Sequence, residues 1–83
     1  MKATRYFGEQ VLRKRPYTSA NQCAEVTARP LRRLIQDDGR IRHWGRVVDG
    51  QDVTTRMLRV VTPDDGETIH NAFFDRDFRE NGP

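Results

Sequence analysis

The sequence is poor in cysteine and histidine and contains no long hydrophobic run. Its one cysteine, Cys23, excludes an internal disulfide and a cysteine-based zinc site, and two histidines far apart make no metal-ligand pattern. No apolar run approaches the roughly 20 residues that span a bilayer, and the N-terminal residues lack the hydrophobic stretch of a secretion signal. We therefore expect a cytoplasmic protein without a metal, another cofactor or a membrane partner.

The chain is short, with 83 residues, and we expect residues 1–83 to form a single domain with a frayed tail at residues 79–83. A domain of about this size buries only about 60% of the surface that its unfolded chain exposes. A deep cleft between two lobes has no room to form. The expected site is a shallow groove on a sheet or at its edge, which suits a polymeric substrate better than an enclosed small molecule.

The formal net charge of +3 hides an asymmetry along the chain. Residues 1–46 contain 11 Lys or Arg against 4 Asp or Glu, whereas residues 47–83 contain 4 against 8. The basic half favours a nucleic-acid surface or a complementary partner that covers it. The alternative is that acidic and basic residues pair across one solvated surface.

Helical periodicity is present before Pro30. The stretch TRYFGEQVLRKR predicts a short amphipathic helix whose apolar stripe is Tyr6, Phe7 and Val11. The stretch SANQCAEVTARP starts with the pattern of a capping box and predicts a second helix over residues 20–28. Cys23 would lie on the inward face of this helix as a small hydrophobic residue rather than a nucleophile.

Four β-rich runs follow Pro30, over residues 31–36, 40–48, 53–62 and 67–74. Turns rich in Asp, Gly and Pro separate the runs, which is typical of an antiparallel meander. The predicted fold class is therefore α+β, with two N-terminal helices packed on a four-stranded antiparallel β-sheet.

Alternation along the strands predicts what each face of this sheet presents. The helices would cover the face with Ile41, Val47, Leu58, Val60, Ile69 and Phe73. The opposite, open face would present Arg42, Trp44, Arg46, Arg59 and His70. Arginine forks and one large aromatic ring suit the phosphates and bases of single-stranded RNA, so we predict nucleic-acid contacts at Arg40, Trp44, Arg46 and Arg76. The alternative is that Trp44 only extends the core.

Metal-free RNA cleavage would need a proton-transfer group and cations that stabilise the charge on phosphorus. The predicted catalytic residues are His70, Arg59 and Arg42, because all three are expected on the open face. His43 is expected to face the helices as a hydrogen-bonded core residue. A purely structural role for His70 remains an alternative.

The sequence DRDF contains two carboxylates that could in principle hold Mg²⁺. A hydrated metal site usually collects carboxylates from more than one element, and no other element clearly supplies them. Pairing of Arg76 with Asp75 or Asp77 is therefore favoured, with Phe74 and Phe78 anchoring the chain.

Four stretches, EQVLRKRPY, DGRIRHWGRV, LRVVTPDDGETIHNAF and DRDF, resemble a set of small bacterial proteins placed near the RelE/ParE-like toxins of toxin-antitoxin modules. The resemblance covers almost the whole chain, from about Tyr6 to Phe78. It implies an RNase-like fold and a type II toxin that acts on mRNA, often at the ribosome, as a metal-independent endoribonuclease. It also implies a cognate antitoxin protein. The positions that match the toxins' catalytic groups are Arg42, Arg59 and His70, with Arg76 beyond them.

The chain departs from the RelE toxins in lacking a clear catalytic tyrosine near its C-terminus and in having few lysines. Two function classes are therefore carried forward. The first is the endoribonuclease toxin, and the second is a non-catalytic module that binds nucleic acid or a protein through the same surface. In a third interpretation, the chain is a purely structural subunit that forms a homo-oligomer, with the open face buried in a homodimer.

Overall fold

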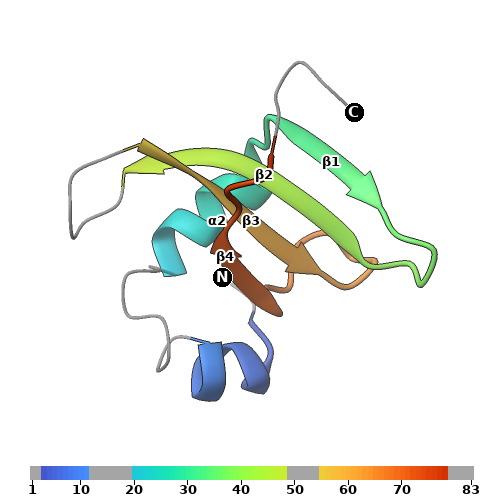
Figure 1. Cartoon of the computed structure of the whole chain (residues 1–83). Coiled ribbons are helices and arrows are strands. Elements are labelled where there is room, and N and C mark those ends of the chain that lie inside the picture. The colour runs from blue at the N-terminus through green and yellow to red at the C-terminus, as the bar shows by residue number, and fades with distance from the viewer. Residues whose placement is uncertain (1–2, 12–19, 49–54, 79–83) are drawn as a thin grey trace.

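The computed structural model describes residues 3–11, 20–48 and 55–78 (Figure 1). The described elements are the π-helix η1 (Phe7–Val11), the α-helix α2 (Ala20–Ala28) and the strands β1 (Arg32–Ile35), β2 (Ile41–Val48), β3 (Thr55–Thr62) and β4 (Asn71–Phe74). The strands form one sheet in the order β1-β2-β3-β4, and each neighbouring pair is antiparallel. The predicted four-stranded meander is therefore confirmed.

The prediction of two N-terminal α-helices is wrong, because the described residues contain a single α-helix, α2. The first segment is instead the five-residue π-helix η1, which includes Gly8, a residue that disfavours helix interiors. The chain is also fixed just before η1, where Ala3 forms a parallel bridge with Ile69 and Thr4 N donates to Ile69 O at 2.8 Å. These tertiary contacts hold Phe7 completely buried and override the helical periodicity.

The second predicted helix is confirmed as α2, with Cys23 and Val26 as its buried residues. Burial raises the pKa of the Cys23 thiol to about 12, so this side chain packs as a small hydrophobic group. Several expectations fall outside the described residues: the basic end of the first helix, the capping residue of the second, the turn at residues 49–52, the strand start at 53–54 and the tail at 79–83.

The two described hairpin turns have similar chemistry, an Asp-Asp-Gly sequence whose glycine has a positive φ, 90° at Gly39 and 70° at Gly66. In the first turn Gly39 N donates to Gln36 O at 3.0 Å, and in the second Gly66 N donates to Pro63 O at 3.2 Å. The first turn joins β1 to β2, where Ile35 faces Ile41, and the second joins β3 to β4. Ile41 also faces Thr62 across the β2–β3 pair.

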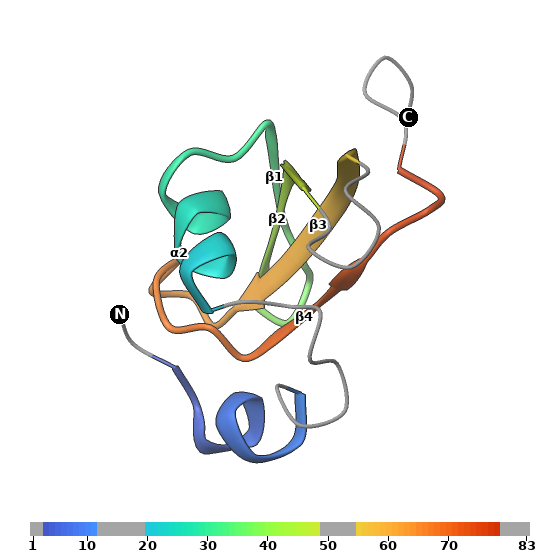
Figure 2. The same ribbon diagram turned by 90° about the vertical axis from the view of Figure 1, so that its left-hand side faces the viewer.

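The core lies between α2 and one face of the sheet, which we call the covered face (Figure 2). Gly45 allows the close approach of α2, because a Cβ at this position would lie 2.9 Å from Val26 Cγ2. The buried core residues are Phe7, Cys23, Val26, Val47, Leu58, Val60, Ile69 and Ala72.

The strand β4 departs from the predicted alternation. Ala72 lies opposite Val60 and belongs to the core, and Phe73 lies opposite Arg59. The prediction that Phe73 faces the helices is therefore wrong by one residue. The cause lies just before the strand: His70 N donates to Val61 O at 2.9 Å while Asn71 is the register partner of Val61, so two residues oppose one, as in a β-bulge.

Candidate functional site

One row of side chains crosses all four strands on the open face, the side of the sheet away from α2. The register partners are Arg32 with Trp44, Trp44 with Arg59, and Arg59 with Phe73. Directly opposed residues on antiparallel strands point to the same face, so cations and aromatic rings alternate along this row. We call Arg32, Trp44, Arg59 and Phe73 the central row.

The guanidinium of Arg59 lies over the ring of Phe73, with Cζ 4.2 Å from the ring centroid. This distance fits a cation–π contact. Arg42 and Arg46 flank the central row on β2, where Arg42 faces Val61 and Arg46 faces Met57. The structure therefore places the predicted residues Arg42, Trp44, Arg46 and Arg59 on one face.

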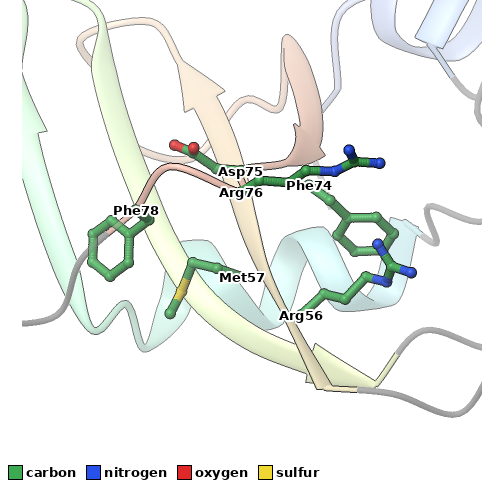
Figure 3. Close-up of a pocket in the computed structure, with 6 residues that line it drawn as sticks. All are labelled: Arg56, Met57, Phe74, Asp75, Arg76 and Phe78. Carbon is green, nitrogen blue, oxygen red and sulfur yellow. The ribbon is translucent and has the colours of Figure 1, made fainter.

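The C-terminal segment, residues 75–78, lies across the central row. Figure 3 shows the chain leaving β4 and passing over β3, with the Phe78 ring on the far side of that strand. Asp75 N donates to Met57 O at 2.8 Å, which fixes the start of the segment on β3. The ring of Phe78 stacks on Trp44 with a centroid separation of 5.3 Å and an interplanar angle of 26°.

Asp75 of the C-terminal segment is the acidic partner of the central row. Its Oδ2 accepts a hydrogen bond from Trp44 Nε1 at 2.9 Å and lies 3.8 Å from Arg59 Nη1. The favoured pairing of Asp75 with Arg76 is therefore corrected, since Arg59 and Trp44 hold the carboxylate. The hydrogen bond between Trp44 and Asp75 joins residues 31 positions apart, and sequence proximity gave no signal for it.

Arg42 and Arg59 of the open face are incompletely neutralised. Burial and the positive charge of Arg42 lower the pKa of Arg59, and Asp75 acts in the opposite direction. Arg59 Nε is buried without a hydrogen-bond acceptor, and the guanidinium of Arg42 has no ion-pair or hydrogen-bond partner within the described parts of the chain. Of these two guanidinium groups only that of Arg59 has a carboxylate partner, which favours the binding of a further anion beside them.

Trp44, which was expected to stack on a base, is covered by the protein in this conformation. The residue is only 6% exposed, and one face of its indole ring contacts Phe78. The alternative interpretation, in which Trp44 packs as part of the protein, describes its present contacts.

His70 lies beside the N-terminal segment. Its Nδ1 is 3.1 Å from the hydroxyl oxygen of Thr4, and its ring centroid is 5.0 Å from that of Tyr6. The three predicted catalytic residues are thus not in contact with one another, because the contacts of His70 are with the N-terminal segment and not with Arg42 or Arg59. The Tyr6 contact was missed because the helix was expected to bury that ring, which is 48% exposed.

His43 is a core residue, as predicted. Its Nε2 lies 3.0 Å from the hydroxyl of Thr62, which itself donates to Pro63 O at 2.9 Å. The hydroxyl proton is therefore used, so Nε2 donates to Thr62 and Nδ1 is a buried acceptor with no donor among residues that the structure describes. Burial, followed by the charge of Arg33, lowers the pKa of His43 and favours the neutral ring.

The two remaining predicted contacts, Arg40 and Arg76, lie at the margins of the open face. Arg40 is exposed, with Nε 3.8 Å from Asp38 Oδ2. Arg76 is exposed in the C-terminal segment and lines a cavity of about 250 Å³. Figure 3 shows Arg76 among the residues that line it. The other residues that line this cavity are Arg56, Met57, Phe74, Asp75 and Phe78.

Within residues 3–11, 20–48 and 55–78, no three His, Cys, Asp or Glu side chains gather as a metal site requires. None of the helices in these residues has the length and apolar character needed to cross a membrane. A scan against protein-family models finds no match to the chain, and searches of the curated proteins and of the solved structures find none either. The open face itself is therefore the basis on which a function is proposed.

Proposed function

We propose that this chain is a non-catalytic module that binds the phosphate backbone of single-stranded RNA on the open face of its sheet. The observation that supports this most directly is the pair of like charges Arg42 and Arg59, of which only Arg59 has a carboxylate partner, Asp75. A phosphate would accept hydrogen bonds from both guanidinium groups and would relieve their mutual repulsion. The proposal predicts strong salt dependence, because bound phosphates release counterions.

A flat sheet with arginines suits a single strand, whose backbone can follow the strands while its bases remain free. Arg42 and Arg59 occupy the middle of the face, and Arg46 lies on the same side towards the end of β2. The described turn carboxylates Asp37, Asp38, Asp64 and Asp65 lie in the connections that follow β1 and β3, outside this arginine group.

The test is the affinity of a labelled single-stranded RNA of about 12 nucleotides, measured by fluorescence anisotropy between about 50 and 200 mM salt. We expect Arg42→Ala to weaken binding roughly tenfold at the lower salt concentration and to reduce the salt slope by about 0.7. Arg5→Ala is the matched control, because it removes the same charge from an exposed i,i+4 pair with Glu9 in the N-terminal segment. Equal affinities of the two variants would overturn the proposal.

A metal-independent endoribonuclease toxin is the second candidate, and one observation favours it. Thr4 Oγ1 accepts from Phe7 N at 3.2 Å, so its own proton is available to His70 Nδ1. The ring is thereby oriented, and its Nε2 has no partner among the residues described. An oriented imidazole with one open nitrogen is suited to proton transfer.

The nuclease candidate is tested by incubating labelled RNA with the protein in EDTA and resolving the products on a gel. Cleavage by the wild type and not by His70→Ala would support the nuclease over the binding module. Binding without cleavage in both samples would leave the non-catalytic proposal standing.

A further inference from the structure

The C-terminal segment places an anion and an aromatic ring on the open face. The Asp75 carboxylate accepts from Trp44 Nε1 and lies next to Arg59 Nη1, at 2.9 and 3.8 Å. The Phe78 ring stacks on the indole of Trp44, and Arg32 Cζ lies 5.8 Å from the centroid of the same Phe78 ring. The residues of the sheet thus contact one carboxylate, of Asp75, and one ring, of Phe78, three positions further along the chain.

A nucleotide offers the same two chemical groups. Its phosphate oxygens accept from guanidinium and indole N–H groups, as a carboxylate does, and its base stacks on an aromatic side chain. The positions of Asp75 and Phe78 therefore coincide with the two contacts that a bound nucleotide would make with Arg59 and Trp44.

We propose that residues 75–78 are an internal competitor of RNA, in which Asp75 occupies a phosphate subsite and Phe78 a base subsite, and that RNA binds by displacing them. This inference rests on the proposed function, and it identifies Trp44 as a base-stacking residue only in the displaced state. The affinity of RNA is then reduced by the fraction of molecules in which the segment covers the central row.

The contacts that hold the segment are of a kind that a ligand can replace. The Asp75 to Arg59 distance of 3.8 Å is long for an ion pair, and Arg76 and Asp77 between the two contacting residues are exposed. Asp77 N donates to Asp75 Oδ1 at 3.0 Å, which ties the segment to itself and not to the sheet. Apart from Asp75 N to Met57 O, the contacts described here between the segment and the sheet are made by side chains.

The experiment compares the wild type, Phe78→Ala and Asp75→Asn for binding of the same labelled RNA. Removing either occupant should strengthen binding about three- to tenfold. Asp75→Asn also removes a negative charge, which by itself attracts RNA, so Asp77→Asn is the matched control. Asp77 is an exposed neighbour whose carboxylate contacts neither Trp44 nor Arg59 in the described structure. Thermal unfolding of each variant verifies that it is folded.

Fluorescence of Trp44, the only tryptophan in the chain, gives an independent measurement. Acrylamide should quench Trp44 more strongly in Phe78→Ala than in the wild type, and RNA should restore the protection of that variant when a base takes the place of Phe78. Quenching that is unchanged by Phe78→Ala would overturn the inference without any RNA present.

The outcomes separate this inference from the proposed function. In one outcome the wild type binds RNA, Asp75→Asn strengthens binding no more than Asp77→Asn does, and Phe78→Ala does not strengthen it. This outcome overturns the proposal that residues 75–78 compete with RNA, and the proposal of an RNA-binding module stands. Absence of RNA binding in the wild type and in all variants overturns both. Binding that appears or strengthens only when Asp75 or Phe78 is replaced supports both.

Discussion

The covered face and the open face of the sheet are made by alternate residues of the same strands, yet different interactions stabilise them. Leu58 and Val60 of β3 are fully buried beneath α2, whereas Arg59 between them lies over Phe73 and beside Asp75. Burial of apolar surface holds the covered face, and its contribution does not depend on a charged partner. The open face depends on ion-pair, hydrogen-bond and ring contacts that a ligand of similar chemistry could replace.

Neighbouring residues of one strand are therefore expected to serve different purposes, one contributing to stability and the next to binding. A large change on the covered face should cost free energy of unfolding, and a comparable change on the open face should mainly alter affinity. The residues that carry a proposed function are thus expected to be nearly neutral for folding.

The largest expected effect is on the covered face. Leu58→Ala should lower the free energy of unfolding by about 3 kcal/mol, because Leu58 is completely buried in the core and its truncation leaves a cavity. Met57→Ala, one residue earlier and half-buried on the open face, should cost less than about 1 kcal/mol. Urea denaturation of both variants measures the difference, and similar costs would show that the faces are not distinct.

The next effect concerns the distance between α2 and the sheet. Gly45→Ala should destabilise by about 1 to 3 kcal/mol, because its Cβ would lie 2.9 Å from Val26 Cγ2 in a packed core. Gly8→Ala is the matched control, since its Cβ would meet no atom within 4 Å. In the double variant Gly45→Ala/Val26→Ala, denaturation should show a cost below the sum of the single costs. Additive costs would contradict this account of Gly45.

A smaller effect on the covered face depends on pH. Burial lowers the pKa of His43, so as pH falls below about 6.5 the unfolded chain takes up a proton that the folded chain does not. The free energy of unfolding should therefore decrease from pH 7 towards pH 5. His43→Gln should flatten this dependence, whereas the control His70→Gln should retain the part due to His43. A wild-type profile equal to that of His43→Gln would refute the neutral core histidine.

The faces of β2 and β3 could be predicted from the sequence because both strands are uninterrupted. Their alternation places Arg42, Trp44 and Arg59 together, as the register confirms. The same reasoning failed on β4, because the irregular step at His70 shifts the phase by one residue and leaves no clear mark in the sequence.

The conformation of the N-terminal segment and the placement of the C-terminal segment on the open face depend on contacts between distant residues. The bridge from Ala3 to Ile69 and the hydrogen bond from Trp44 to Asp75 join parts of the chain whose proximity follows only from the finished sheet. Helical periodicity could not reveal the first, and charge pairing between neighbours pointed to Arg76 instead of Arg59 for the second. Both errors arise where a long-range contact overrides a local pattern.

The smallest expected effect is the contribution of the Trp44 to Asp75 hydrogen bond to folding. A double-mutant cycle with Trp44→Phe and Asp75→Asn should give a coupling free energy of about 1 kcal/mol or less, because water replaces the partner of an incompletely buried carboxylate when the bond is lost. The same variants should change RNA affinity more than they change stability. A coupling free energy as large as the cost of Leu58→Ala would mean that the C-terminal segment is part of the folded core. Displacement by a ligand would then be too costly, and the open face would have to bind its partner with the segment in place.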